Sequence, residues 1–295
     1  MVSQSYDAAD GGRIWGEYVK QYTGANLYNY AVSGAVCSND ITPRNLSTGT
    51  AEFLFPAVEQ YEVPAYIADS QYVENGTKFL DIPAQSTVYA MWIGTNDLGV
   101  DTLLTDSQVP GTNITSYVDC VYDQLQRIYD NGGRYFVLFN VAPLQLTALY
   151  GLPGQGGVGP NGYWPDKPSN LTEISDRMME QVVSVNAIYE YRTPFAVEIN
   201  RRFPGSHFAV YDVYSLIYDI HNNPSQYLNG TAPLNVTGFI QHCNLEREDC
   251  TQEASPDSFL WFDELHPSEQ TERVIAKNFV DVVSGNSSFA QYWSF

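Results

Sequence analysis

A nearly uninterrupted apolar run, STVYAMWI at residues 86–93, constrains the fold more than any other stretch of the chain. A strand that is apolar on both faces needs a cover on both sides, as in a parallel sheet between two helical layers. Similar runs occur at 26–34, 134–141 and 207–213. Between and after them, apolar residues recur with helical spacing, at 13–22, 53–69, 114–131, 172–202 and 268–283. The alternation predicts one α/β domain over residues 1–295, with a parallel sheet between helical layers.

The charge of the chain excludes several classes of partner. The formal net charge is −20 over 295 residues, and the sequence pI is near 4.3. Such acidity disfavours nucleic acids and anionic membrane surfaces. No apolar run approaches the length of about 18 residues that a membrane-spanning helix needs. We therefore expect a protein that binds neither nucleic acid nor membrane. We also expect it to be a monomer.

Sequons and cysteines point to the secretory pathway. Asn-x-Ser/Thr sequons occur at Asn45, Asn75, Asn113, Asn170, Asn229, Asn235 and Asn286. Cys243 and Cys250 are close enough in a loop-like stretch to form a local disulfide, whereas Cys37 and Cys120 could be paired or remain buried thiols. The sequence predicts a secreted, N-glycosylated protein.

The stretch SFLWFDELHPS at residues 258–268 holds the best candidate for chemistry. Asp263 precedes His266 by three residues on the turn that launches the last helix. The carboxylate could accept the Nδ1 proton of the imidazole and leave Nε2 free as a base. The alternative is a surface turn in which Asp263 caps the helix and His266 is merely exposed.

Two further motifs follow predicted strands. Gly34 offers an unhindered backbone N–H, and Asn96 in the motif Gly94–Asp97 offers a side-chain amide. Each motif taken alone is equally well read as a plain turn. Both, however, lie with Asp263 and His266 at the carboxyl edge of the predicted sheet, where ligands bind. This shared location favours a catalytic interpretation, with Gly34 and Asn96 as oxyanion donors.

The order of these motifs resembles that of the SGNH (GDSL-type) hydrolase superfamily. The matching blocks are Val32–Gly34, Gly94–Asp97 and Asp263–His266. A closer likeness to the fungal acetyl esterases of carbohydrate esterase family 16 lies in Gly12–Trp15, Tyr30–Cys37 and Trp261–Pro267.

The resemblance implies a flavodoxin-like three-layer α/β/α fold without a cofactor. It also implies a serine esterase that deacetylates plant cell-wall oligosaccharides. His266 would be the base, Asp263 its partner, and Gly34 and Asn96 part of the oxyanion hole.

The first block of that superfamily, an apolar strand ending in Gly-Asp-Ser, has no counterpart here. Ser5 is a weak candidate nucleophile, because only Met1 and Val2 precede the faint echo of the block that begins at Ser3. The polar start also contains no signal peptide. We expect an N-terminally incomplete secreted enzyme that lacks its first strand, and that is loosely folded and inactive as it stands.

The alternative is a non-catalytic, carbohydrate-binding descendant of the same fold. It would keep the cleft and its aromatic side chains, namely Trp92, Tyr163, Trp164 and Trp261. Metal hydrolysis is not expected, because His207, His221 and His242 lack ligand spacing. The long Gly- and Pro-rich segment 148–170 is predicted to be a functional or mobile loop.

Overall fold

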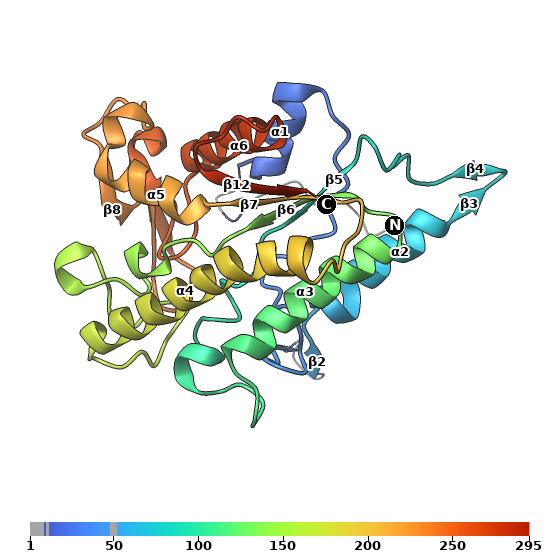
Figure 1. The fold of residues 1–295 in the computed structure, drawn as a ribbon. Helices are drawn as coiled ribbons and strands as arrows, with labels where there is room; N and C mark the ends of the chain where they lie inside the picture. Colours follow the sequence, from blue (N-terminus) through green and yellow to red (C-terminus); the bar gives the residue numbers. More distant parts are fainter. Residues whose placement is uncertain (1–8, 10–11, 48–51, 295) are drawn as a thin grey trace.

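The central sheet has four strands in the computed structural model, which describes residues 9, 12–47 and 52–294. Strands β5 (Val88–Met91), β6 (Tyr135–Phe139) and β7 (His207–Tyr211) run parallel, and β12 (Ala290–Ser294) pairs antiparallel with β7. The order is β12-β7-β6-β5 (Figure 1). The predicted α/β fold with a mainly parallel sheet is confirmed.

Helices cover both faces of this sheet. On one face lie α1 (Trp15–Thr23) and α6 (Glu269–Val283), which pack against each other. The opposite face carries α2 (Val63–Gln71), α3 (Ile114–Asp130) and α4 (Leu171–Pro194) (Figure 1). A further helix, α5 (Val213–Asn222), follows β7 directly. No helix within the described residues is long and apolar enough to cross a membrane.

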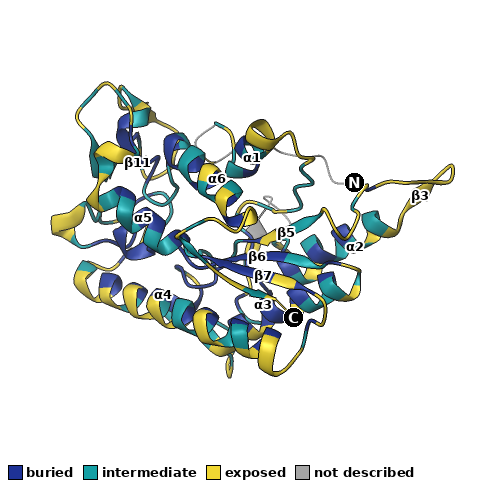
Figure 2. Cartoon of the chain, turned by 45° about the horizontal axis from the view of Figure 1, so that its top comes forward, coloured by how far each residue is buried: buried dark blue, intermediate teal, exposed yellow. Residues whose placement is uncertain are grey.

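The apolar pattern of β6 explains why both layers are needed. Residues 136–139 are all buried, and β6 and β7 are mostly dark blue between the helices in Figure 2. The ring of Phe139 lies 4.9 Å from that of Trp15 in α1 and 5.7 Å from that of Phe279 in α6. Neighbouring Phe136 packs on Phe203 beyond α4, at 6.3 Å between ring centroids. Alternate residues thus fill opposite cores.

The strand predicted at 26–34 does not form. Its backbone and side chains are instead held by α2 and the turn before it. Val32 N–H donates to Glu62 Oε1 at 2.7 Å, and the Tyr30 hydroxyl donates to Asp69 Oδ2 at 2.9 Å. The segment pairs with no strand of the described sheet, in which β5 is an edge strand. An apolar pattern predicts burial, but a strand also needs a partner for its backbone groups.

Several predicted helices are shorter or interrupted. The helix predicted at 53–69 is not continuous: its first residues end a strand, Val58–Glu62 form a π-helical turn, and α2 follows. The prediction at 172–202 ends as α4 at Pro194, followed by a π-helical turn at Phe195–Ile199. Helices α1, α3 and α6 match their predicted ranges closely.

Small two-stranded sheets complete the fold. They pair β1 (Asn45–Ser47) with β2 (Glu52–Leu54), β3 (Val73–Glu74) with β4 (Thr77–Lys78), β8 (Asn235–Phe239) with β11 (Phe259–Trp261), and β9 (Gln241–Cys243) with β10 (Cys250–Gln252). Only β8 and β11 are parallel. The sequence predicted none of these pairs, and β11 lies in a run that was singled out only for its aromatic residues.

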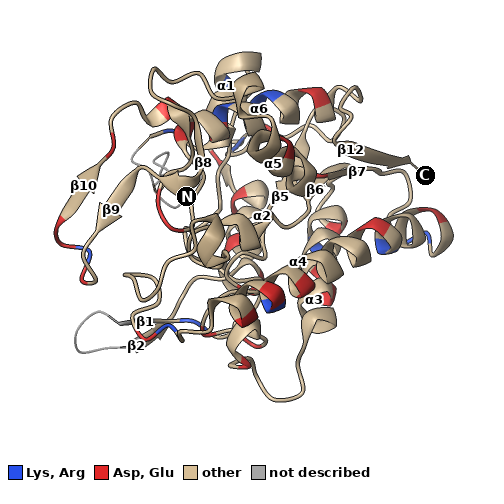
Figure 3. Ribbon diagram, turned by 90° about the vertical axis from the view of Figure 1, so that its left-hand side faces the viewer, with Lys and Arg blue, Asp and Glu red and all other residues tan. Residues whose placement is uncertain are grey.

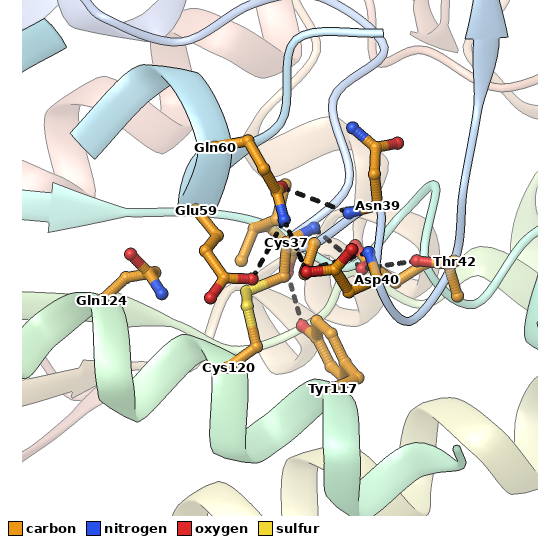
Figure 4. The surroundings of a disulfide bond; sticks show 12 residues. Cys37, Asn39, Asp40, Thr42, Glu59, Gln60, Tyr117, Cys120 and Gln124 are labelled. Carbon is orange, nitrogen blue, oxygen red and sulfur yellow. Dashed lines mark hydrogen bonds between the residues drawn. A yellow bond between two sulfur atoms is a disulfide. The ribbon is translucent and has the colours of Figure 1, made fainter. Parts of the chain in front are cut away.

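Both cysteine pairs are disulfides. The predicted Cys243–Cys250 bond closes the β9–β10 hairpin. Cys37 and Cys120, left open by the sequence, are also bonded, which fastens the segment after Gly34 to α3 (Figure 4). The described residues contain no free cysteine.

Candidate active site

A tight turn presents Asp263 and His266 at the end of β11. Phe262 N–H donates to His266 O at 2.8 Å, and Trp261 forms an isolated antiparallel bridge with Pro267. The cap of α6 is Ser268, whose hydroxyl accepts a hydrogen bond from Thr271 N–H. The alternative in which Asp263 caps this helix is therefore wrong.

Asp263 and His266 form an acid–imidazole dyad. Asp263 Oδ1 accepts the backbone N–H groups of Leu265 at 2.9 Å and of His266 at 2.8 Å. Both carboxylate oxygens lie 3.0 Å from His266 Nδ1. The Asp263 side chain is 3% exposed and that of His266 is 32% exposed.

Charge and tautomer follow from this geometry. Burial acts to raise the pKa of Asp263, but hydrogen bonds from His266 and its positive charge outweigh it and lower the pKa to about 2. A carboxylate facing Nδ1 favours the tautomer with the proton on that atom. Nε2 makes no hydrogen bond with any described residue, so it is free to accept a proton from a reacting group.

Gly34 and Asn96 meet at a second turn. Gly34 has φ +95°, and the turn is closed by a bond from Ala35 N–H to Val32 O at 3.0 Å. Asn96 Nδ2 donates to Ala35 O at 3.0 Å, which leaves its second N–H available. The Gly34 N–H donates to no group in the described part of the chain. The two predicted oxyanion donors therefore sit on adjoining segments, and their catalytic role stays a prediction.

A single loop connects this turn with the dyad. Leu149 N–H donates to Glu264 O at 2.7 Å, beside Asp263. The hydroxyl of neighbouring Tyr150 accepts from Val100 N–H at 3.3 Å, just beyond Asn96. Residues 149 and 150 thus join the two halves of the candidate site, and among the described residues no hydrogen bond links His266 to Gly34 or Asn96.

Asp97 is a buried carboxyl behind the oxyanion turn. Its Oδ1 accepts the Cys37 N–H at 2.8 Å and the Thr42 hydroxyl at 3.2 Å, whereas Oδ2 has no partner among the described residues. Burial raises the pKa of Asp97 to about 7, against these hydrogen bonds. Burial likewise raises the pKa of Glu62 to about 7.

We expect the stability of the protein to fall as the pH rises from about 4 to about 7. A carboxyl whose folded pKa lies above its unfolded value of about 4 binds more protons in the folded state throughout this window, so ionisation favours unfolding. Urea unfolding at pH 4.5 and pH 7 measures the effect. Asp97→Asn should flatten the difference while Asp106→Asn, an exposed change, should not. A pH-independent urea midpoint in the wild-type chain would contradict the assignment.

The sequence missed two members of the site. The Tyr163 hydroxyl donates to Asp263 Oδ2 at 2.6 Å, and Arg247 NH2 donates to the Tyr163 oxygen at 2.9 Å. The sequence indicates Tyr163 only as a ring of the cleft in the carbohydrate-binding alternative, and it gives no signal for Arg247, which stands in a polar loop. The pairing joins residues 84 positions apart, which local patterns do not reveal.

Other predicted site residues take different places. Trp164 and Trp261 are 6% and 2% exposed, so these rings belong to the core and line no cleft. Trp92 stacks on Phe139 at 5.1 Å between ring centroids. Ser5 lies outside the described residues. The described residues hold no group of three or more His, Cys, Asp or Glu side chains placed for a metal ion.

Comparison with known proteins identifies relatives along almost the whole chain. The family model of the GDSL-like lipase/acylhydrolases matches residues 3–279. An acetylesterase of Hypocrea jecorina is 43% identical over 99% of this chain and 82% of its own length.

Plant relatives match less of the chain. A GDSL esterase/lipase of Arabidopsis thaliana is 27% identical over 58% of this chain and 51% of its own length. An inactive GDSL esterase/lipase-like protein of the same plant is 23% identical over 68% of this chain and 45% of its own length. The chain thus spans about half the length of these plant proteins.

Proposed function

Because the chain belongs to the GDSL-like lipase/acylhydrolase family, we propose that it is an acetyl esterase that deacetylates plant cell-wall oligosaccharides. The observation that carries the proposal is the dyad, in which both Asp263 oxygens lie 3.0 Å from His266 Nδ1. The similarity to an acetylesterase supports the choice of acyl group. Membership of a family of lipases and acylhydrolases supports ester hydrolysis as the reaction.

The proposed mechanism uses His266 twice. Nε2 takes the proton of a serine hydroxyl as the serine oxygen attacks the acetyl carbonyl carbon. The oxyanion accepts hydrogen bonds from Gly34 N–H and the Asn96 amide. As the C–O bond to the sugar breaks, His266 returns the proton to the leaving sugar oxygen, and water then releases acetate by the same steps. Ser5 is a weak candidate for the nucleophile, and no described hydroxyl bonds to Nε2.

A polar oligosaccharide suits the surroundings of the dyad better than a long acyl chain. A cavity of about 170 Å³ is lined by Asn161, His242 and Glu264, the residue after Asp263, but by neither residue of the dyad. Amide, imidazole and carboxyl groups can bond to sugar hydroxyls.

We also propose that the protein works outside the cell. The two disulfides are typical of an oxidising compartment. The asparagines of six of the seven sequons are exposed, all except the half-buried Asn235. Aspartate and glutamate positions, red in the ribbon of Figure 3, recur along helices and loops, in keeping with the net charge of −20.

A non-catalytic carbohydrate-binding role is the second candidate. It is favoured by the free Nε2 of His266, which faces no hydroxyl in the described part of the chain. The similarity to an inactive plant relative also supports it.

The experiment that separates the two candidates measures acetate release from partly acetylated xylo-oligosaccharides and from nitrophenyl esters of acetate and of a long acyl chain. Contrary to the inactivity expected from the sequence, the proposed function requires the acetates to be hydrolysed and the long ester to be a poor substrate. A fluorophosphonate probe should label one serine, which peptide mapping then locates. Binding of the oligosaccharide without acetate release or labelling would favour the non-catalytic role, and preference for the long ester would contradict the proposed substrate.

A further inference from the structure

Tyr163 reaches the acid of the dyad from a separate loop. Its hydroxyl donates to Asp263 Oδ2 at 2.6 Å and lies 3.3 Å from His266 Nδ1. The two rings of Tyr163 and His266 lie 5.7 Å apart between centroids. The hydroxyl therefore shares the carboxylate with the imidazole, so it can influence both the position of Asp263 and how strongly Asp263 holds the Nδ1 proton.

Arg247 holds Tyr163 from the other side. Its guanidinium lies 4.2 Å from the centroid of the Tyr163 ring and donates to the hydroxyl oxygen at 2.9 Å. Other arginines of this acidic chain pair with carboxylates, as in Arg177–Asp106, Arg192–Asp119, Arg202–Asp123 and Arg273–Asp257. Within the described residues no carboxylate lies at ion-pair distance from Arg247. Its positive charge is therefore directed at the tyrosine.

Local structure fixes the tyrosine. Tyr163 stands in a tight turn in which Asn161 and Trp164 exchange backbone hydrogen bonds, and the Asn161 side chain accepts the Tyr163 N–H at 2.9 Å. Lys167 anchors the loop by donating to Leu149 O at 2.6 Å. The segment 148–170, predicted to be functional or mobile, is thus a tied loop that presents one hydroxyl to Asp263.

The arginine comes from the hairpin closed by the Cys243–Cys250 disulfide, which projects from the body of the molecule in Figure 3. Arg247 adopts a left-handed backbone, φ +61°, in the loop between the two cysteines. Its stem passes directly over Gly162, where an added Cβ would lie 2.3 Å from Arg247 Cγ. Glycine at this position is what lets the arginine approach the tyrosine.

We propose that Tyr163 and Arg247 are positioning residues for the dyad, with Tyr163 holding Asp263 Oδ2 and Arg247 holding and polarising the Tyr163 hydroxyl. The disulfide-closed hairpin thereby helps to set the strength of the bond between Asp263 and His266. The inference rests on the proposed function only in giving this bond a catalytic purpose.

Two other titratable groups lie near this cluster, Glu264 and His242. Burial raises the pKa of Glu264, and the charge of Asp263 adds to this, while Arg247 and His242 act in the opposite direction. The hydrogen bond from Tyr163 helps to keep the pKa of Asp263 low, after the larger influence of His266. Tyr163→Phe leaves Glu264, His242 and Arg247 in place, whereas Arg247→Gln also removes a charge that lowers the pKa of Glu264, so Tyr163→Phe gives the more direct comparison with the wild-type chain.

NMR of the full chain tests the proposal without requiring hydrolysis. Tyr163→Phe keeps the ring and removes the hydroxyl. We expect it to raise the pKa of Asp263, followed through its carboxyl carbon, from about 2 by roughly one unit. At pH 7 the Nδ1 proton of His266 should move downfield, because Oδ2 has lost a competing donor. Arg247→Gln should shift both signals in the same direction by less.

Gly162→Ala provides a second route, since it displaces the arginine without removing its charge; it should reproduce Arg247→Gln. A matched control is the remote pair Arg134 and Tyr129, whose guanidinium-to-ring distance is 4.4 Å. Arg134→Gln and Tyr129→Phe should leave both signals unchanged. The proposal would be overturned if Tyr163→Phe left both signals unchanged, or if the control variants shifted them equally. The role of Arg247 would be overturned if the Arg247→Gln and Gly162→Ala chains gave the same signals as the wild type. Loss of esterase function alone would change neither readout.

Discussion

Asp263→Asn is expected to hydrolyse 4-nitrophenyl acetate about 10³- to 10⁴-fold more slowly than the wild-type chain. The reason is that one of the two Asp263 carboxylate oxygens already accepts backbone hydrogen bonds. Oδ1 accepts two backbone N–H groups, from Leu265 and His266, so the amide oxygen of the asparagine must take that position. The amide nitrogen then faces Nδ1 as a donor. The imidazole proton is driven to Nε2, and the base is lost.

The losses of activity caused by substituting the two dyad residues should not be additive. His266→Ala removes the base outright, so adding Asp263→Asn to it should cause little further loss. The rates of the two single variants and the double variant, measured at one pH, give the coupling. His221→Ala is the control and should retain full activity, because the one hydrogen bond of this imidazole within the described residues is to Asn222, at 3.5 Å. A double variant whose loss equals the product of the single losses would show that the residues act independently.

The sequence could predict those parts of the site whose residues lie close together along the chain. Asp263 and His266 stand three positions apart on one turn, and the Gly34 and Asn96 turns each follow an apolar run. The rule that parallel strands present their carboxyl ends at one edge applies only to the Asn96 turn, which follows β5. Residues 26–34 form no strand, and β11 pairs with β8 outside the central sheet, so the sequence could not predict how the three parts meet. Tyr163 and Arg247 carry no such signal, because their position depends on how two long loops fold over the dyad.

The same distinction explains the fold. Strands β6 and β7 were predictable because each is buried on both faces, so the apolar pattern alone identifies them. The segment 26–34 has a similar pattern but is held by Glu62 and Asp69 from the α2 region. Burial is encoded locally, whereas strand pairing depends on the partner that tertiary structure supplies.

Removing the Cys37–Cys120 disulfide is expected to lower the free energy of unfolding by roughly 4.5 kcal/mol, whereas removing Cys243–Cys250 should cost only about 2.4 kcal/mol. The bonds close loops of very different length, with sequence separations of 83 and 7. In the chain-entropy account, the longer cross-link restricts the unfolded chain more. Urea unfolding of the two double alanine variants at constant pH measures both values.

The longer disulfide should matter for the site as well as for stability. Cys37 N–H donates to Asp97 Oδ1, and Cys37 O accepts from Glu59 N–H, next to Gln60 in the network of Figure 4. Loss of the bond to Cys120 on α3 frees the segment that also carries Gly34. The free energy of unfolding of the Cys37→Ala, Cys120→Ala chain should therefore depend more steeply on urea concentration, because its unfolded state is more expanded.

This variant should also lose esterase activity at urea concentrations below its unfolding transition. Equal stability losses in the two variants would contradict the loop-length explanation, and full activity in the first would separate the Gly34 turn from the disulfide that fastens it.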